Sequence, residues 1–336
     1  MTDMSLADIL SARHVIAGVA DRTPMLPSAH LTDRFGHEML LKLESLQPIG
    51  AFKLRGALNA VAGLPDDTKG VTCCSTGNHG RAVAFAARRR GFHAVVCMSD
   101  LVPETKRDGI RRLGAGVRIV GKSQDDAMQE ADRLSREEGF ANISPFDDPR
   151  VVAGQGTIGL EMLEARPDIG TILIPLSGGG LAAGVALAAR AIAPRVRLIG
   201  VSMDRGAAMA ASVAAGRPVE VREVVSLADS LGGGIGLHNT MTFPMCRDLL
   251  DDIVLVTEPE IRDAMQVLFF EDRLVTEGAC VVGIAALLAG RIALPGGPVA
   301  TIITGRNVDM EVFARIVAGL DLTLGDLHLE GRRYAA

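Results

Sequence analysis

Aromatic side chains are scarce in this chain: tryptophan is absent, and Tyr334 is the only tyrosine. Proteins that bind single-stranded nucleic acid stack bases on aromatic rings, and this sequence lacks the rings for such a platform. There are five cysteines, an odd number, without any CxxC pair, and Cys73 and Cys74 lie inside an apolar run. This usage favours reduced, buried thiols in a cytoplasmic protein over a disulfide framework or a zinc site.

Long apolar runs and an excess of one charge are missing as well. No apolar stretch approaches membrane-spanning length, and the N-terminal sequence MTDMSLADIL has no basic start followed by an apolar core. Lys and Arg number 35 against 40 Asp and Glu, a net charge of −5, which gives no general attraction to nucleic acid or acidic lipid. The expected partner is therefore a small molecule, with no nucleic acid and no membrane.

What the sequence does contain is a regular alternation of short β-branched runs with amphipathic or alanine-rich segments. It predicts strands at 71–75, 93–98, 117–120, 171–177, 196–202, 252–257 and 298–304, and helices at 78–90, 103–114, 123–139, 259–273, 278–290 and 310–319, with further helices from 180 and 205. This alternation predicts an α/β protein with two doubly wound, mostly parallel sheets.

The length of 336 residues is comfortable for two domains. The sequence SPFDDPR at 144–150 is typical of a loop and marks a candidate boundary. We expect a small, mobile domain at 69–149 and a large cofactor-binding domain built from 1–68 plus 150–336.

A glycine turn follows one of the predicted strands. In TILIPLSGGGLAAG, the residues Ser177–Gly180 come after a buried strand and before a helix, where N–H groups can converge on an anion. A plain tight turn would carry the same glycines. The segment also matches a nucleotide-binding fingerprint loosely, as Gly178-x-Gly180-x-x-Ala183 with Asp204 after the next strand, so an NAD-dependent dehydrogenase is a rival interpretation.

A second polar turn lies in STGNHGRAV at 75–83. Ser75, Thr76 and Asn78, together with the N–H groups of the helix start, could bind a carboxylate. Taken alone, the turn is more simply an ordinary helix cap. His79 lacks metal-ligand neighbours at helical spacing, so a structural role is its default.

The sequence AFKLRGA places Lys53 directly after Phe52 in an apolar setting. A lysine is ordinarily solvated, but burial would lower its pKa and make the amine a nucleophile. Thr304, Ser75 and Ser177 all lie at the ends of predicted strands, where parallel α/β sheets bind ligands. The lysine, the two candidate anion-binding turns and the strand-end hydroxyl are therefore considered together as parts of one candidate site.

Together these motifs resemble those of the fold-type II pyridoxal-phosphate enzymes, the threonine dehydratase and serine racemase family. The matching segments, in the family's order, are AFKLRGA, STGNHG, GQGTIGLE, SGGGLAAG and TGRNVD, and the likeness runs from about Leu6 to Gly319. The resemblance implies a tryptophan synthase β-like fold, pyridoxal 5'-phosphate as cofactor and a homodimer.

The resemblance also implies a role for each matched residue. Lys53 would bond covalently to the cofactor and act as the base at the substrate's Cα, and Phe52 would pack against the cofactor ring. Asn78 would meet the cofactor's 3-hydroxyl and Thr304 its pyridine nitrogen. The phosphate would receive N–H groups from Gly178, Gly179, Gly180 and Leu181, and the substrate carboxylate would be held by Ser75, Thr76, Asn78 and His79.

Four positions depart from the family's pattern. Ala51 stands where the family usually has serine, so a hydroxyl on the phosphate side is absent. Thr76 stands where serine racemases use serine as the acid on the opposite face, which makes it a second catalytic candidate and argues against racemisation. A racemase-like metal site needs an acid at the positions of Ser202 and Ala208, so no metal is expected.

A narrower resemblance, carried by segments such as VCMSDLVP and GVSMDRGAAM, is to the dehydratase of bacterial hydroxyectoine-utilisation clusters. The implied activity is β-elimination from a β-hydroxy α-amino acid, giving a keto product and ammonia, in hydroxyectoine catabolism. Catabolic dehydration of L-threonine or L-serine is the alternative, since intact hydroxyectoine has no free primary amine. The NAD-dependent dehydrogenase leaves AFKLRGA and STGNHG unexplained, and a non-catalytic small-molecule-binding protein leaves Lys53 unexplained.

Overall fold

The computed structural model describes residues 4–75, 77–100, 102, 104–122, 124–294 and 296–335. Their strands form two parallel-dominated sheets and a separate hairpin. The large sheet contains β1 (Met25–Pro27), β2 (Met39–Lys42), β7 (Thr171–Pro175), β8 (Arg197–Met203), β9 (Asp252–Val256) and β10 (Val299–Ile302). The small sheet contains β3 (Val71–Cys74), β4 (Ala94–Met98), β5 (Gly116–Ile119) and β6 (Ala141–Asn142), and the hairpin is β11 (Leu322–Leu324) with β12 (Leu327–Leu329).

The order in the large sheet is β1-β2-β10-β7-β8-β9, and only the β1–β2 pair in it is antiparallel. The small sheet has the order β5-β4-β3-β6, with every pair parallel. The predicted fold class, two mostly parallel sheets with helices between the strands, is confirmed.

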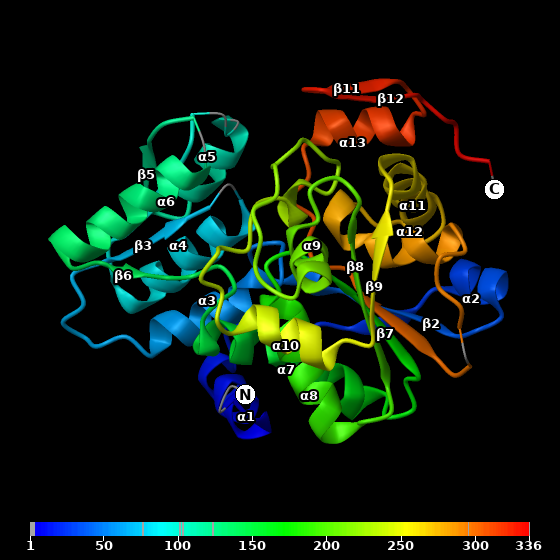
Figure 1. The fold of residues 1–336 in the computed structure, drawn as a ribbon, viewed down its shortest axis with the longest axis horizontal. Coiled ribbons are helices and arrows are strands. Elements are labelled where there is room, and N and C mark those ends of the chain that lie inside the picture. The colour runs from blue at the N-terminus through cyan, green and yellow to red at the C-terminus, as the bar shows by residue number, and fades with distance from the viewer. Residues whose placement is uncertain are drawn as a thin grey trace.

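Helices connect the strands and cover the sheets (Figure 1). They are α1 (Leu6–Ile16), α2 (Ala29–Phe35), α3 (Lys53–Ala62), α4 (Asn78–Arg90), α5 (Glu104–Arg111), α6 (Gln124–Arg133), α7 (Pro149–Ala165), α8 (Gly180–Ile192), α9 (Ala208–Ala215), α10 (Thr242–Leu249), α11 (Glu258–Phe270), α12 (Val282–Leu288) and α13 (Met310–Val317). Three short 3₁₀ turns are η1 (Glu44–Leu46), η3 (Asp229–Leu231) and η4 (Gly278–Cys280), and η2 (Leu134–Glu138) is a π turn.

The large sheet is buried on both faces because alternate residues of its strands point to opposite sides. Leu173 and Ile199 pack into the cluster that includes α11 and α12. Their neighbours Ile172 and Leu198 pack into the cluster that includes α7 and α8. The two clusters hold the sheet between two helical layers, so the carboxyl ends of its parallel strands are left as the edge available for a site.

Two predicted helices differ from the observed ones. The segment predicted as one helix at 123–139 is α6 followed by the π turn η2, which ends at Gly139 in the left-handed conformation. The segment predicted as a helix from 278 begins instead with η4, and α12 starts at Val282. Helix ends and local widening depend on packing, which periodicity in the sequence does not report.

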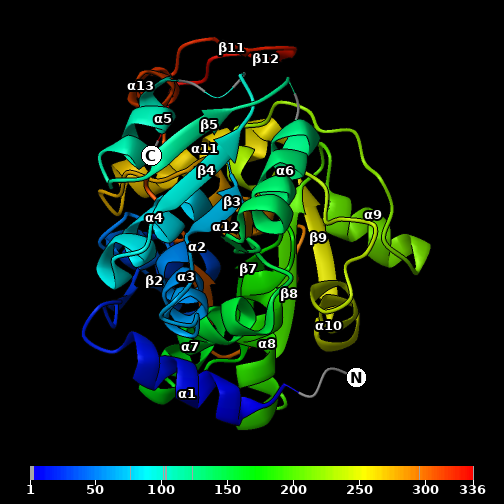
Figure 2. The same cartoon turned by 90° about the vertical axis from the view of Figure 1, so that its left-hand side faces the viewer.

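The small sheet and helices α4, α5 and α6 form one lobe, and the large sheet forms the other (Figures 1 and 2). We propose that 69–149 is a small domain and that 1–68 plus 150–336 is a large one, because every strand of the small sheet falls within the first range. Among the described residues, no helix is both long and apolar enough to cross a membrane.

Candidate active site

Lys53 is the first residue of α3, and the chain just before it is fixed to the end of strand β10. The N–H of Phe52 donates to the carbonyl oxygen of Thr304 at 3.0 Å, and Ala51 forms an isolated antiparallel bridge with Gly305. On the other side of Gly305, the N–H of Arg306 donates to the carbonyl oxygen of Gly50. The structure therefore brings Lys53 to the carboxyl end of the large sheet, beside Thr304.

The amine end of Lys53 is withdrawn from solvent. Its Nζ donates to the carbonyl oxygen of Pro145 at 2.7 Å and lies 5.3 Å from the centre of the Phe52 ring. The residue as a whole is half-buried, but its amine end is deep enough that burial lowers the pKa of Lys53 to about 8. Within the described part of the chain, no carboxylate forms an ion pair with it. Because burial disfavours the charged form, about a tenth of the amine is neutral and nucleophilic at pH 7, far more than for an ordinary lysine.

The glycine turn lies at the start of α8, where the first N–H groups of the helix have no carbonyl partner one turn back. Gly179 has φ of 91°, a left-handed conformation that a side chain would strain. A Cβ at Gly178 would collide with the ring of Phe146, and one at Gly180 would come within 2.9 Å of the Cα of Phe146. The turn is therefore a backbone cradle at the positive end of a helix, and it suits a phosphate.

The cradle is braced from α10 and from the loop before α7. The hydroxyl of Thr242 donates to the carbonyl oxygen of Gly178 at 2.7 Å. The carboxylate of Asp147 accepts the N–H groups of Thr240, Met241 and Thr242, at 3.2, 3.1 and 2.8 Å. Sequence patterns did not identify this support, because the partners lie about 30 to 100 residues apart and meet only through the fold.

The polar turn of the small sheet lies at the end of β3. The Oγ of Ser75 accepts the N–H groups of Gly77 and Gly80, at 3.2 and 2.9 Å, so Ser75 does cap the start of α4. His79 is buried, and its Nε2 lies 2.8 Å from the carbonyl oxygen of Ile143. Burial, and then the nearby charge of Lys53, lower the pKa of His79 to about 3, so its ring is neutral. The candidate Thr76 lies outside the described residues.

Asn78 forms hydrogen bonds with two residues that were not candidates from the sequence, Glu277 and Asn307. Its Nδ2 donates to both carboxylate oxygens of Glu277, and its Oδ1 accepts from Nδ2 of Asn307 at 2.6 Å. Glu277 also accepts the N–H of Asn307 at 2.8 Å and the hydroxyl of Ser230 at 3.0 Å. Burial, and then Asp229, raise the pKa of Glu277 against the opposing effect of these donors. The sequence TEGAC could have indicated Glu277, because this acid lies between two apolar segments, much as Lys53 lies in an apolar run.

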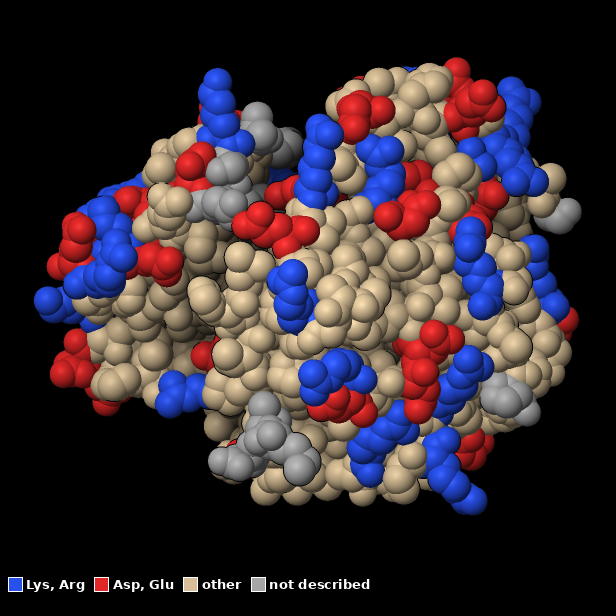
Figure 3. Space-filling model, viewed as in Figure 1, with Lys and Arg blue, Asp and Glu red and all other residues tan. Residues whose placement is uncertain are grey.

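The space between the two lobes is open at the surface, since the space-filling view is hollowed there (Figure 3). Basic and acidic side chains are interspersed over this face. Such a mixed surface is consistent with a small-molecule ligand that enters between the lobes.

The fold and the site together define an α/β protein in which a glycine cradle suited to an anion and a desolvated lysine both lie at the carboxyl ends of strands of the large sheet. The family model for pyridoxal-phosphate dependent enzymes matches residues 16–305. The chain therefore belongs to the pyridoxal-phosphate dependent enzyme family, and pyridoxal 5'-phosphate is its cofactor.

Curated relatives and solved structures agree with this family. The chain is 53% identical over 322 residues to a "Putative threonine dehydratase" of Sinorhizobium fredii, covering 95% of this chain and 97% of the relative. It is 36% identical to the catabolic L-threonine dehydratase of Escherichia coli K12, with the same two coverages. The structure of maize serine racemase superposes with a TM-score of 0.88 at 32% identity, covering 94% of this chain and 97% of that one.

These findings confirm the predicted cofactor and the predicted class of enzyme, a pyridoxal-phosphate-dependent lyase similar to the threonine dehydratases. They argue against the rival interpretation as an NAD-dependent dehydrogenase. The residues present fit the cofactor: a lysine with a lowered pKa is available for the aldehyde, and the glycine cradle admits no side chain and presents free N–H groups.

Proposed function

We propose that this protein removes the β-hydroxyl of a β-hydroxy α-amino acid as water and releases a 2-oxo acid and ammonia. The observation that carries the proposal is the buried amine of Lys53 at the carboxyl end of the large sheet, in a chain whose relatives include threonine dehydratases. L-threonine and L-serine are the substrate class that these relatives favour.

The roles proposed for the cofactor-binding residues are those that the resemblance to the family implies. Lys53 would bond to the cofactor's aldehyde, and Phe52 would pack against its ring. The N–H groups of the cradle, from Gly178 to Leu181, would bind the phosphate. Asn78 would meet the 3-hydroxyl and Thr304 the pyridine nitrogen. When bound, pyridoxal phosphate supplies a conjugated system that accepts the electron pair left at the substrate's Cα.

The chain's own side chains would move the proton and bind the substrate. Lys53, once displaced by the substrate amine, would take the proton from Cα, for which a pKa of about 8 is well matched to neutral pH. Ser75, Thr76, Asn78 and the neutral His79 would hold the substrate carboxylate. Thr304 would place a neutral hydroxyl beside the pyridine nitrogen, where a carboxylate would keep that nitrogen protonated. The ring would then accept electrons less strongly, which favours prompt loss of the β-hydroxyl.

A hydroxylated diaminobutyrate derived from hydroxyectoine is the finer substrate hypothesis. Its support is the narrower resemblance of STGNHGRAV, GVSMDRGAAM and ADSLGGGIGL to the hydroxyectoine-utilisation dehydratase. A homodimer and a cytoplasmic location stay predictions, and sedimentation of the purified protein tests the first.

The test uses the purified full-length protein loaded with pyridoxal phosphate. We expect a yellow protein that releases 2-oxo acid from L-threonine, L-serine or hydroxylated diaminobutyrate, without racemising them. Lys53→Ala should abolish both the visible absorbance of the covalently bound cofactor and the release of 2-oxo acid. The exposed Lys122→Ala should change neither. If Lys53→Ala keeps both properties, the proposal is wrong.

A further inference from the structure

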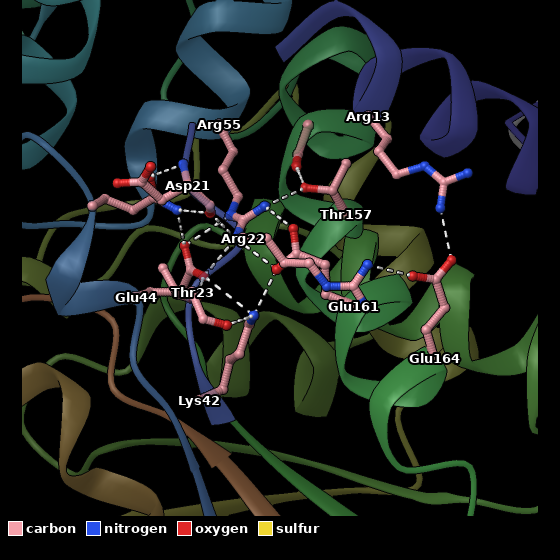
Figure 4. A network of polar contacts seen from close by, with 12 residues as sticks. Arg13, Asp21, Arg22, Thr23, Lys42, Glu44, Arg55, Thr157, Glu161 and Glu164 are labelled. Atoms are coloured by element: carbon pink, nitrogen blue, oxygen red, sulfur yellow. Dashed lines mark hydrogen bonds and ion pairs between the residues drawn. The ribbon is translucent and has the colours of Figure 1, made fainter. Parts of the chain in front are cut away.

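Two of the sequence motifs contain charged residues to which the proposed reaction gives no role. Arg55 belongs to AFKLRGA, and Glu161 belongs to GQGTIGLE. The structure places both in one buried network with Glu44 and Lys42, between α3, α7 and strand β2 (Figure 4). Their exposed fractions are 1%, 7%, 0% and 2%, respectively, so water screens these charges very little.

Arg55 is the centre of the network. Its Nε and Nη2 donate to the two oxygens of Glu44, at 2.8 and 2.7 Å. Its Nη1 and Nη2 donate to the two oxygens of Glu161, at 2.6 and 2.9 Å. Further bonds reach the hydroxyl of Thr157 and the carbonyl oxygen of Asp21. The planar guanidinium thus joins two carboxylates in fork geometry, which an ammonium cannot reproduce.

Next to Arg55, helices α3 and α7 cross at close range. A Cβ on Gly154 would lie 2.6 Å from the Cα of Gly56, and one on Gly56 would lie 2.5 Å from Nε2 of Gln155. Since no side chain fits at either position, the helix backbones touch, and Arg55 and Glu161 pair beside the crossing. The two motifs therefore interlock through both backbone contact and charge.

Lys42 balances the charge through bonds to residues outside α3. Its Nζ donates to Glu161 at 2.6 Å and to the carbonyl oxygen of Thr23 at 2.7 Å, and it lies 4.0 Å from Glu44. Two cations and two carboxylates leave the network neutral. Lys42 is therefore a matched comparison for Arg55: it is a buried cation with the same acidic partners but lies on β2.

Arg55 lies two residues after Lys53 in the first turn of α3. We propose that Arg55, held by Glu44 and Glu161, is a positioning residue that sets where α3 presents the amine of Lys53. The far side of Lys53 is already fixed by the bond from Phe52 to Thr304, so the network supplies the second anchor. This inference rests on the proposed role of Lys53 as the cofactor lysine.

The covalent step needs accurate placement. The amine nitrogen of Lys53 would bond to the cofactor's aldehyde carbon, and its two hydrogens would leave with the aldehyde oxygen as water. Misplacing a reacting atom by about 1 Å can cost a factor of about 100. A loosened α3 should therefore change Lys53 chemistry beyond any loss of folding stability.

The experiment compares Arg55→Lys with Lys42→Met in the full-length, cofactor-loaded protein. Three readouts are taken: thermal midpoint, the pH midpoint of the cofactor's visible absorbance, and the fraction of Lys53 trapped by borohydride and found by peptide mass spectrometry. We expect both variants to lower the thermal midpoint. Only Arg55→Lys should shift the pH midpoint, reduce trapping at Lys53 and lower kcat, by about tenfold to a hundredfold.

If Lys42→Met changes the Lys53 readouts as much as Arg55→Lys, or neither variant changes them, the inference is overturned. Should Arg55→Lys fail to fold, Thr157→Val removes one bond from Arg55, at 3.1 Å, and the bond that the Thr157 hydroxyl donates to the carbonyl oxygen of Gly154, at 2.6 Å. This variant should also shift the pH midpoint. An unchanged midpoint in that variant also overturns the inference. Trapping of the wild-type protein at another lysine would instead refute the proposed function.

Discussion

The Nδ2 of Asn78 donates to both carboxylate oxygens of Glu277, at 3.0 and 2.9 Å. Asn78 is the first residue of α4 beside the small sheet, and Glu277 precedes η4 beside the large one. The pair therefore ties the two lobes together. A buried carboxyl in this position responds to pH, because its charged form is desolvated.

Glu277→Gln should make the protein less sensitive to rising pH. The pKa of Glu277 in the folded protein is raised above the ordinary 4.5, mainly by burial. Its contribution to stability is therefore fully present below about pH 4.5 and is lost as the pH rises through the folded-state value. Denaturant unfolding between pH 4 and 8 should show wild type losing stability relative to Glu277→Gln as pH rises. A gap that stays constant would contradict the raised pKa.

Lys53→Met should stabilise the cofactor-free protein while removing its activity. Burial lowers the pKa of Lys53 from 10.5 to about 8, which corresponds to a penalty of about 3 kcal/mol on the charged form. Removing the amine relieves this penalty but also loses the hydrogen bond to Pro145, which contributes about 1 kcal/mol. A lowered lysine pKa means that its stability contribution is present above about pH 10.5 and is lost as the pH falls to 8. The gain of about 2 kcal/mol should therefore be flat below pH 8 and disappear toward pH 10.5. Lys122→Met, at an exposed site, should show no such profile.

Asp147→Ala should weaken cofactor binding through the cradle. The change removes the acceptor for three N–H groups at the start of α10, whose Thr242 braces Gly178. Loss of such a cap costs about 1–2 kcal/mol of folding stability, and a comparable loss at the cradle would raise the Kd for pyridoxal phosphate about tenfold.

The neighbouring Asp148 provides a matched control. Its Oδ1 caps α7 by accepting the N–H groups of Arg150 and Val151, at 2.7 and 3.0 Å. Asp148→Ala should therefore lose about 1 kcal/mol of stability with an unchanged Kd for the cofactor. Equal Kd values for the two variants, measured by equilibrium titration, would show that Asp147 does not support the cradle.

The parts of the site that sequence predicted are those that depend on a few neighbouring residues. The glycine turn was visible because a strand, three glycines and a helix start follow one another directly in the sequence. Lys53 was visible because its apolar neighbours are adjacent in the chain. Glu277, Asp147 and the partners of Arg55 were not identified, since each acts through contacts with residues far away in the sequence. Long-range pairing is decided by how α3, α7 and the sheets pack, which one sequence does not reveal.

Glu44→Gln should destabilise the protein strongly at neutral pH and much less in acid. Burial would raise the pKa of Glu44, but its bonds from Arg55 outweigh this and lower it below 4.5. Its contribution to stability is therefore present above about pH 4.5 and is lost as the pH falls through the folded-state value. Removing this charge leaves Arg55 and Lys42 buried with Glu161 as their remaining acid, which typically costs about 3–5 kcal/mol.

Glu38 supplies the comparison, because its pKa is also lowered by an arginine, Arg166, but on the surface. Exposed pairs are screened by water and contribute little, so Glu38→Gln should leave the unfolding free energy nearly unchanged. The test is to measure the free energy of unfolding in urea for both variants and wild type at pH 7 and at pH 3.5. A Glu44→Gln deficit of the same size at both pH values would mean that folding does not lower the pKa of Glu44. Arg55 and Lys42 would then not stabilise the charged form of Glu44, contrary to the ion pairs of the buried network.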